Sequence, residues 1–218
     1  MNAARWVLAG CVFAAFAALV LRGWWRVLPV FSCYCAASGI ALLTHIRLEL
    51  WFGQSWLTWN YVLLVLRSLA AGEIVVAASR GVSPRERAAA IGFASAVAAG
   101  FCALSWLPHR PDTVYYATAS IMRQTEAALL LMIAGGLALL WRVGLPLRPI
   151  LWHALIFAAL MMNQIWTAMA RPSTGILWRQ QHAAYLAVSI SCAAAWVIFA
   201  VRCSPRAASS RRPRGERP

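Results

Sequence analysis

The run that most clearly decides the fold is AAYLAVSISCAAAWVIFAV, residues 183–201, which contains no charged side chain. An α-helix rises about 1.5 Å per residue, so about 20 apolar residues are needed to cross the roughly 30 Å of hydrocarbon in a bilayer. Six further runs of similar character precede it, at residues 6–22, 27–45, 57–79, 88–107, 117–141 and 149–169. The pattern predicts an all-α, polytopic membrane protein whose seven transmembrane helices form one bundle.

The composition favours the same class of protein. Hydrophobic residues make up 62% of the 218 residues and charged residues 12%, about half of their usual share in soluble domains. We therefore expect one membrane domain over residues 1–201 and a disordered, basic cytoplasmic tail over residues 202–218. The net charge of +14 is scattered between apolar runs, which argues against nucleic-acid binding and favours contact of the tail with anionic lipid headgroups.

The distribution of arginine predicts the orientation, because short cytoplasmic loops carry an excess of basic residues. With the N-terminus outside, five arginines lie on the outer side: Arg5, Arg47, Arg110, Arg171 and Arg179. Thirteen then lie on the cytoplasmic side: Arg22, Arg26, Arg80, Arg85, Arg87, Arg142, Arg148, Arg202, Arg206, Arg211, Arg212, Arg214 and Arg217. The predicted topology is therefore N-terminus outside and C-terminus inside.

Tryptophan marks the ends of the predicted spans. Most indoles lie near a span end, where the ring is half buried and its N–H stays satisfied. Trp24 and Trp25 mark an inner end, whereas Trp196 lies well within the last span. The main interpretation is an anchoring belt, and the alternative is a ligand cage built from Trp56, Trp59 and Trp178.

Charged residues inside the spans are the first candidates for a functional site, since each costs a few kcal/mol at the bilayer centre. Arg67 and Glu73 lie in the third span, and Arg123 and Glu126 share a face of the fifth. Counting residues from the outer ends places Arg67 and Glu126 at similar depth. The sequence therefore predicts an ion pair between them.

Other polar residues extend this predicted buried layer. His153 lies in the inner half of the bundle, as does Glu73, and Asn163 and Gln164 are placed to satisfy Arg123. Two interpretations stay open. Either the layer only fixes the register of the helices, or it lines a cavity for a ligand, a proton or an ion.

Three histidines, His45, His109 and His182, fall near the outer surface in this topology. Imidazoles gathered on one side are able to hold a metal or a haem, which makes these residues weak candidates for such a site. No fixed ligand spacing accompanies them, so we predict no metal and no cofactor.

Some chemistries are missing from the sequence. It contains no lysine, which excludes the Schiff base of a seven-helix retinal protein. No Gly-x-Ser-x-Gly, His-Glu-x-x-His or P-loop motif occurs, so no catalytic residues are predicted and an enzyme is not indicated.

A family resemblance is carried by four features. The segment Leu28-Pro29-Val30-Phe31-Ser32-Cys33-Tyr34, Glu73, the stretch from Arg123 and Glu126 to Leu131, and Tyr185 with Trp196 are similar to features of a group of small seven-span inner-membrane proteins abundant in acidobacterial genomes. The likeness covers about residues 25–200. It implies a multi-pass protein of the bacterial inner membrane and no specific chemistry.

Three classes of function remain. The first is a seven-helix sensing or receptor-like module that binds a small ligand and signals to a protein partner in the membrane or cytoplasm. The second is a structural or assembly subunit of a membrane complex. The third is a proton-coupled transporter using Glu73, Glu126 and His153; it is less favoured, because the sequence shows no internal repeat.

Overall fold

The computed structural model describes residues 2–48, 54–79, 83–105, 114–142, 148–169 and 176–205. This part of the chain is helical throughout and contains no β-strand. Its elements are α1 (Asn2–Leu21), a 3₁₀ turn η1 (Trp24–Arg26), α2 (Pro29–Leu48), α3 (Gln54–Ala78), α4 (Pro84–Ser105), α5 (Val114–Arg142), α6 (Arg148–Met169) and α7 (Ile176–Arg202). The prediction of an all-α fold with seven helices is confirmed. The predicted tail beyond residue 205 lies outside the described residues.

Five of these helices are long and apolar enough to cross a membrane, namely α1, α2, α3, α6 and α7. The other two do not show an apolar stretch of this length within their described residues. The first turn of α4 carries Arg85, Glu86 and Arg87, and the described apolar stretch of α5 is Gln124–Ala138. In hydrocarbon a helix satisfies its backbone N–H and C=O groups internally, which explains why long apolar runs adopt this structure.

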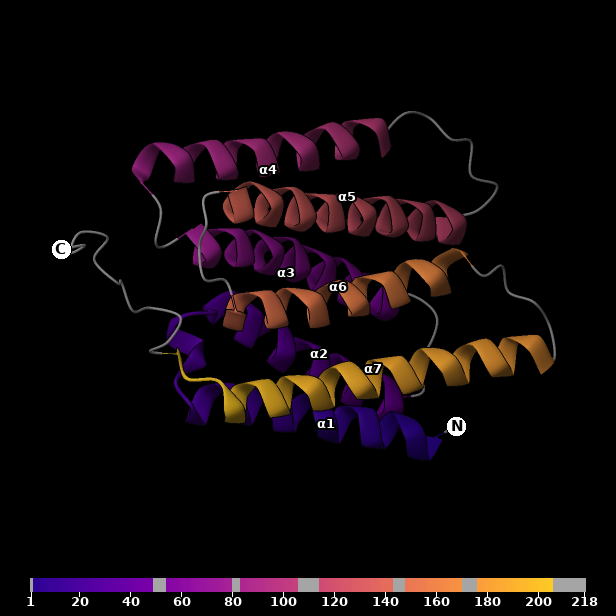
Figure 1. Ribbon diagram of the computed structural model, residues 1–218. Helices are drawn as coiled ribbons and strands as arrows, with labels where there is room; N and C mark the ends of the chain where they lie inside the picture. Colours follow the sequence, from indigo (N-terminus) through magenta and orange to yellow (C-terminus); the bar gives the residue numbers. More distant parts are fainter. Residues whose placement is uncertain are drawn as a thin grey trace.

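Six of the helices make contacts that close a ring in the order α1, α2, α3, α5, α6 and α7, in which α7 packs against α1. The remaining helix, α4, lies outside this ring at the edge of the bundle (Figure 1), and its main contacts are with α5 and, less extensively, with α3. The first and last helices of the chain therefore complete the ring together.

Contacts at both ends of the pair show that α1 and α7 run in the same direction. Near the start of each helix, Arg5 Nη2 lies 3.2 Å from His182 Nε2. Near the end of each, Arg22 Nη2 donates to the carbonyl oxygen of Val201 at 3.0 Å. The second contact satisfies one of the carbonyls that the last turn of a helix leaves without a helical partner.

The turn between α1 and α2 corrects the prediction for Trp24. Gly23 adopts a left-handed conformation with φ of 77°, which lets the chain turn directly after α1. Trp24 is then fully buried, its ring lies 4.7 Å from that of Phe199, and its Nε1 donates to the carbonyl oxygen of Cys203. It is therefore part of the core rather than the anchoring belt, whereas its neighbour Trp25 is exposed.

The start of α4 is fixed by a capping box. Ser83 Oγ accepts from the backbone N–H of Glu86, and the Glu86 carboxylate accepts from the backbone N–H of Ser83. Pro84 takes the first helical position, where its missing N–H costs nothing. Glu86 therefore has a structural role at an exposed position.

Glycines allow close packing where α5 meets its neighbours. A Cβ atom at Gly136 would lie 3.0 Å from a methyl group of Val75 in α3, and one at Gly135 would lie 2.7 Å from the ring of Phe93 in α4. Gly72 in α3 differs, because a Cβ there would meet nothing within 4 Å.

This difference gives a matched test of the packing. We expect Gly136→Leu to lower the free energy of unfolding by about 1–3 kcal/mol, because the added side chain overpacks the contact with Val75. The control Gly72→Leu faces open space and should change stability by much less. Unfolding in detergent micelles, followed by tryptophan fluorescence, measures both; equal losses would contradict the packing described.

Candidate functional site

The predicted ion pair between Arg67 and Glu126 is present and joins α3 to α5. Both side chains are buried, with 4% and 3% of their surface exposed. Arg67 Nε also donates to the carbonyl oxygen of Leu63 in its own helix. These bonds use two of the five N–H donors of the guanidinium, so the group has donors left for another partner.

Glu73 contacts the first turn of α2, an arrangement that the sequence did not identify. Its two carboxylate oxygens accept hydrogen bonds from the backbone N–H groups of Val30 and Phe31, at 3.0 Å and 2.9 Å. The first N–H groups of a helix lack helical partners and carry the positive end of its dipole, so a carboxylate there is stabilised. Glu73 therefore acts as an N-terminal cap supplied by another helix.

His153 lies in an aromatic cluster on the other side of Phe31. Its ring is fully buried between Phe31 and Phe199, with ring centroids 4.4 Å and 5.8 Å away. The indole Nε1 of Trp196 donates to Nδ1 of His153 at 3.2 Å, which makes Nδ1 an acceptor and places the proton of the neutral ring on Nε2. Glu73 and His153, both predicted in the inner half, thus both contact the start of α2.

The two amides of α6 make hydrogen bonds with α7. Asn163 Nδ2 donates to the carbonyl oxygen of Tyr185 and to the hydroxyl of Ser189, and Gln164 Nε2 donates to the Tyr185 hydroxyl at 3.0 Å. The side chain of Arg123, their predicted partner, lies outside the described residues. Their contact with Arg123 therefore stays a prediction.

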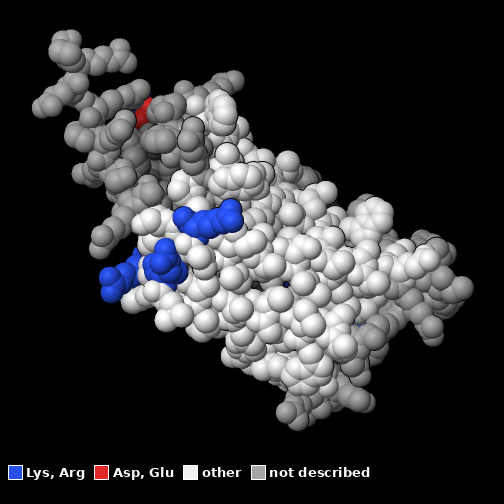
Figure 2. All heavy atoms as spheres, turned by 60° about the horizontal axis from the view of Figure 1, so that its bottom comes forward, with Lys and Arg blue, Asp and Glu red and all other residues white. Residues whose placement is uncertain are grey.

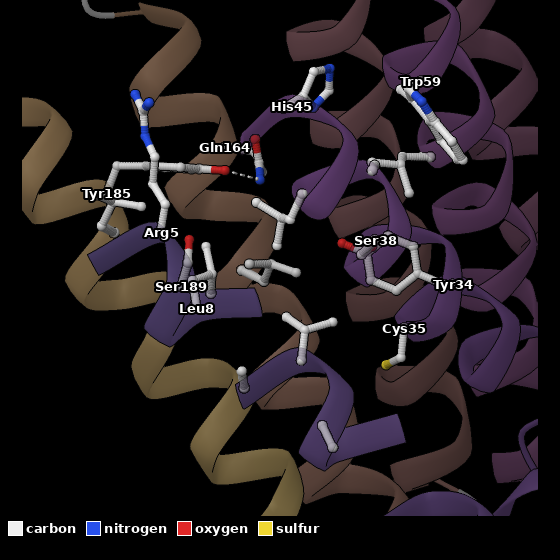
Figure 3. Close-up of a pocket in the computed structure, with 18 of the residues that line it drawn as sticks. Arg5, Leu8, Tyr34, Cys35, Ser38, His45, Trp59, Gln164, Tyr185 and Ser189 are labelled. Carbon is white, nitrogen blue, oxygen red and sulfur yellow. Dashed lines mark hydrogen bonds between the residues drawn. The ribbon is translucent and has the colours of Figure 1, made fainter. Parts of the chain in front are cut away.

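The structure contains a cavity of about 180 Å³ inside the ring, lined by α1, α2, α3, α6 and α7 (Figure 3). Of the predicted polar layer, Arg67 and Gln164 line it; Glu73, Glu126, His153 and Asn163 do not. The other polar lining residues are Arg5, Tyr34, Ser38, His45, Trp59, Asn60, His182, Tyr185, Ser189 and Trp196.

The polar groups are concentrated toward one end of the cavity. Figure 3 shows Arg5, His45 and Gln164 at this end, with Cys35 nearer the other. Arg5 is half buried and donates from Nη2 to Nε2 of His182, which must be the acceptor because a guanidinium has no lone pair to offer. At the far end, the indole of Trp196 both lines the cavity and contacts His153.

Two of the three candidate histidines, His45 and His182, line this cavity, while His109 lies outside the described residues. Nε2 of His182 already accepts a hydrogen bond from Arg5. Among the side chains that the structure describes, no group of three histidine, cysteine or acidic residues is placed to hold a metal. The two histidines are therefore cavity-lining groups in this arrangement.

Several lining residues were missed by the sequence analysis. The sequence places Arg5 only as a charge of an outer segment, Tyr34 only within the family resemblance, and Cys35 and Ser38 only within the apolar run 27–45. The i, i+1, i+4 spacing of Tyr34, Cys35 and Ser38 on α2 was the available signal. Trp59, proposed for a ligand cage, does line the cavity, whereas the side chains of Trp56 and Trp178 lie outside the described residues.

No family model matches the chain, and no characterised protein or solved structure shows significant similarity to it.

A double-mutant cycle on Arg67 and Glu126 tests the buried pair. We expect Glu126→Gln to lower the free energy of unfolding by about 3–5 kcal/mol, because it leaves a buried guanidinium without a countercharge. The double variant Arg67→Gln/Glu126→Gln should lose less than the sum of the two single losses. Glu86→Gln, at the exposed capping box, is the control and should cost about 1 kcal/mol or less. Strict additivity in the cycle would contradict a direct pair.

Proposed function

We propose that this protein is a seven-span protein of the bacterial inner membrane that binds a small ligand in the cavity between α1, α2, α3, α6 and α7. In this proposal it is a sensing or receptor-like module, and its cytoplasmic tail is the contact for a protein partner and for anionic headgroups. The observation that carries the proposal is the cavity itself, which collects polar side chains from five helices inside an apolar bundle.

The lengths of α4 and α5 support seven spans rather than five. With 22 and 29 residues they are about 33 Å and 43 Å long, enough to cross the hydrocarbon region. They also lie alongside the five apolar helices in the bundle (Figure 1). Packing against α3 and α6 covers part of the more polar surface of α5, including Glu126.

Exposed arginines support the proposed orientation. Arg22, Arg26 and Arg202 are exposed and lie at the ends of α1, η1 and α7. Arginine gathers at one end of the described surface in Figure 2, and α1 and α7 both finish at this end. Because basic residues are retained on the cytoplasmic side, this end is assigned to the cytoplasm.

A topology assay tests this assignment. A fluorescent protein that folds only in the cytoplasm, fused after residue 218, should fluoresce in intact cells, whereas a periplasmic alkaline phosphatase fused there should be inactive. The reverse pair of results would overturn the orientation. Fusions after residue 172 provide the internal control, because this loop is expected on the outer side and should give the opposite readout.

The buried polar residues divide between the two interpretations left open by the sequence. Glu73 and Glu126 are engaged in helix contacts away from the cavity, which is a structural role. Arg67 and Gln164 line the cavity, which is the role expected of binding groups. Ligand pockets typically combine apolar walls with a few convergent polar groups, and this cavity has that composition.

The two alternative functions are less well supported. A proton-coupled transporter would need carboxylates along a pathway, but Glu73 caps α2, Glu126 pairs with Arg67, and neither lines the cavity. An assembly subunit is favoured by one observation, the position of α4 outside the ring, where one side of the helix is exposed.

Thiol modification tests whether the cavity is open to a ligand. Cys35 and Cys192 are both buried, with 2% and 6% of their surface exposed, but only Cys35 lines the cavity. In a variant that keeps only Cys35, the neutral reagent methyl methanethiosulfonate should modify this thiol, and Ala41→Trp, which fills the cavity, should slow the reaction roughly tenfold because it removes access to the thiol. In a variant that keeps only Cys192, the same substitution should leave the rate unchanged, so the intrinsic reactivity of each thiol does not enter the comparison. A rate at Cys35 that Ala41→Trp does not change would contradict a ligand-accessible cavity.

A further inference from the structure

We infer that the ligand is a small organic anion, a carboxylate or a similar acid with an apolar body of about the size of one ring. This inference rests on the proposed function and adds the chemical class of the ligand. It is carried by the charges of the cavity, by its walls and by its volume.

The charges of the cavity are of one sign. Arg5 and Arg67 both line it, and no aspartate or glutamate is among its described lining residues. The countercharge of Arg67, Glu126, belongs to α5, which contributes no described residue to the lining. Arg67 therefore pairs with a carboxylate outside the cavity while its own side chain lines the cavity, and its bonds to Glu126 and Leu63 use two of its five N–H donors.

Low-dielectric walls strengthen the effect of these guanidinium groups. A cleft lined by one sign of charge and enclosed by apolar groups focuses the field and concentrates counter-ions of the opposite sign. Here the surroundings are the interior of an apolar bundle, where charges are screened far less than in water. A carboxylate near Arg5 would also find donors at Gln164 and Tyr185, which are joined by a hydrogen bond at the same end of the cavity.

The walls select an apolar body for this anion. Each of the five lining helices contributes a leucine: Leu8, Leu42, Leu63, Leu160 and Leu186. These side chains offer no ligands to a hydrated inorganic ion, but they match a hydrocarbon group. The polar groups at one end and leucines along the walls thus fit a molecule with one charged end.

The volume limits the length of that molecule. An apolar cavity of about 150 Å³ binds benzene, so the cavity of about 180 Å³ has space for a single ring or a short acyl chain with its acidic group. A complete membrane lipid does not fit. Benzoate, benzyl alcohol and benzamidine form a suitable series of probes, since they share one shape and differ in charge.

The test uses the full-length protein with Cys35 as its only cysteine. The anionic reagent sulfonatoethyl methanethiosulfonate and the cationic reagent trimethylammonioethyl methanethiosulfonate are compared at Cys35, and the ratio of their rates is divided by the same ratio for free 2-mercaptoethanol. This double ratio removes the intrinsic reactivity of the thiol. We expect it to be about tenfold or more in favour of the anion, the size of effect that a focused field produces.

Arginine variants locate the origin of the preference. Arg5→Gln should lower the double ratio several-fold, with the remainder due to Arg67, and Arg5→Lys, which keeps the charge, should retain most of it. Arg67→Gln is the more demanding variant because it leaves Glu126 buried alone, so the half-buried Arg5 provides the decisive comparison. Benzoate should slow modification of Cys35 and raise the melting temperature, whereas benzyl alcohol and benzamidine should do so much less.

Four outcomes separate the two proposals. If neutral methyl methanethiosulfonate fails to reach Cys35, the cavity is closed and the proposed function itself fails. If the neutral reagent reacts but the double ratio is one or favours the cation, the anion is ruled out while a ligand cavity stands. If chloride or inorganic phosphate protects Cys35 as well as benzoate does, the organic body is ruled out. An anionic preference that depends on Arg5, with protection by benzoate alone, supports the inference.

Discussion

The contact between Arg67 and Glu126 is the interaction on which the rest of the bundle depends. A guanidinium in the middle of an apolar helix is tolerated only with a countercharge, and that countercharge comes from α5. The pair therefore fixes α3 against α5 within the ring and holds the Arg67 side chain, which also lines the cavity. Although α5 contributes no described lining residue, its Glu126 pairs with Arg67 and so influences the charge at the cavity wall.

The other described carboxylates also have structural roles and do not line the cavity. Glu73 closes the first turn of α2 with two backbone N–H groups, and Glu86 closes the first turn of α4. Acidic side chains in the described bundle thus serve helix ends and one ion pair. The basic groups Arg5 and Arg67 line the cavity. The charged side chains of the cavity are therefore positive, whereas the negative carboxylates have structural roles outside it.

Much of the fold followed from the sequence, because apolar length and residue depth along a helix are local properties. They located the seven helices and the partner of Arg67. The partners of Glu73 and Trp24 were not predictable in this way, because both bind backbone groups whose position depends on how helices meet. The cavity was missed for a related reason. Its walls are leucines and small polar residues that a periodicity argument assigns to the core, and only the arrangement of five helices leaves space between them.

The pairing of α1 with α7 has a consequence for biogenesis. Of the seven helices, α1 is synthesised first and α7 last, and both contribute walls to the cavity. During synthesis, Arg5 therefore precedes its contact His182 by six helices and meets it only when α7 packs against α1. The cavity is enclosed only after that step, so a chain truncated before α7 would lack one of its five walls.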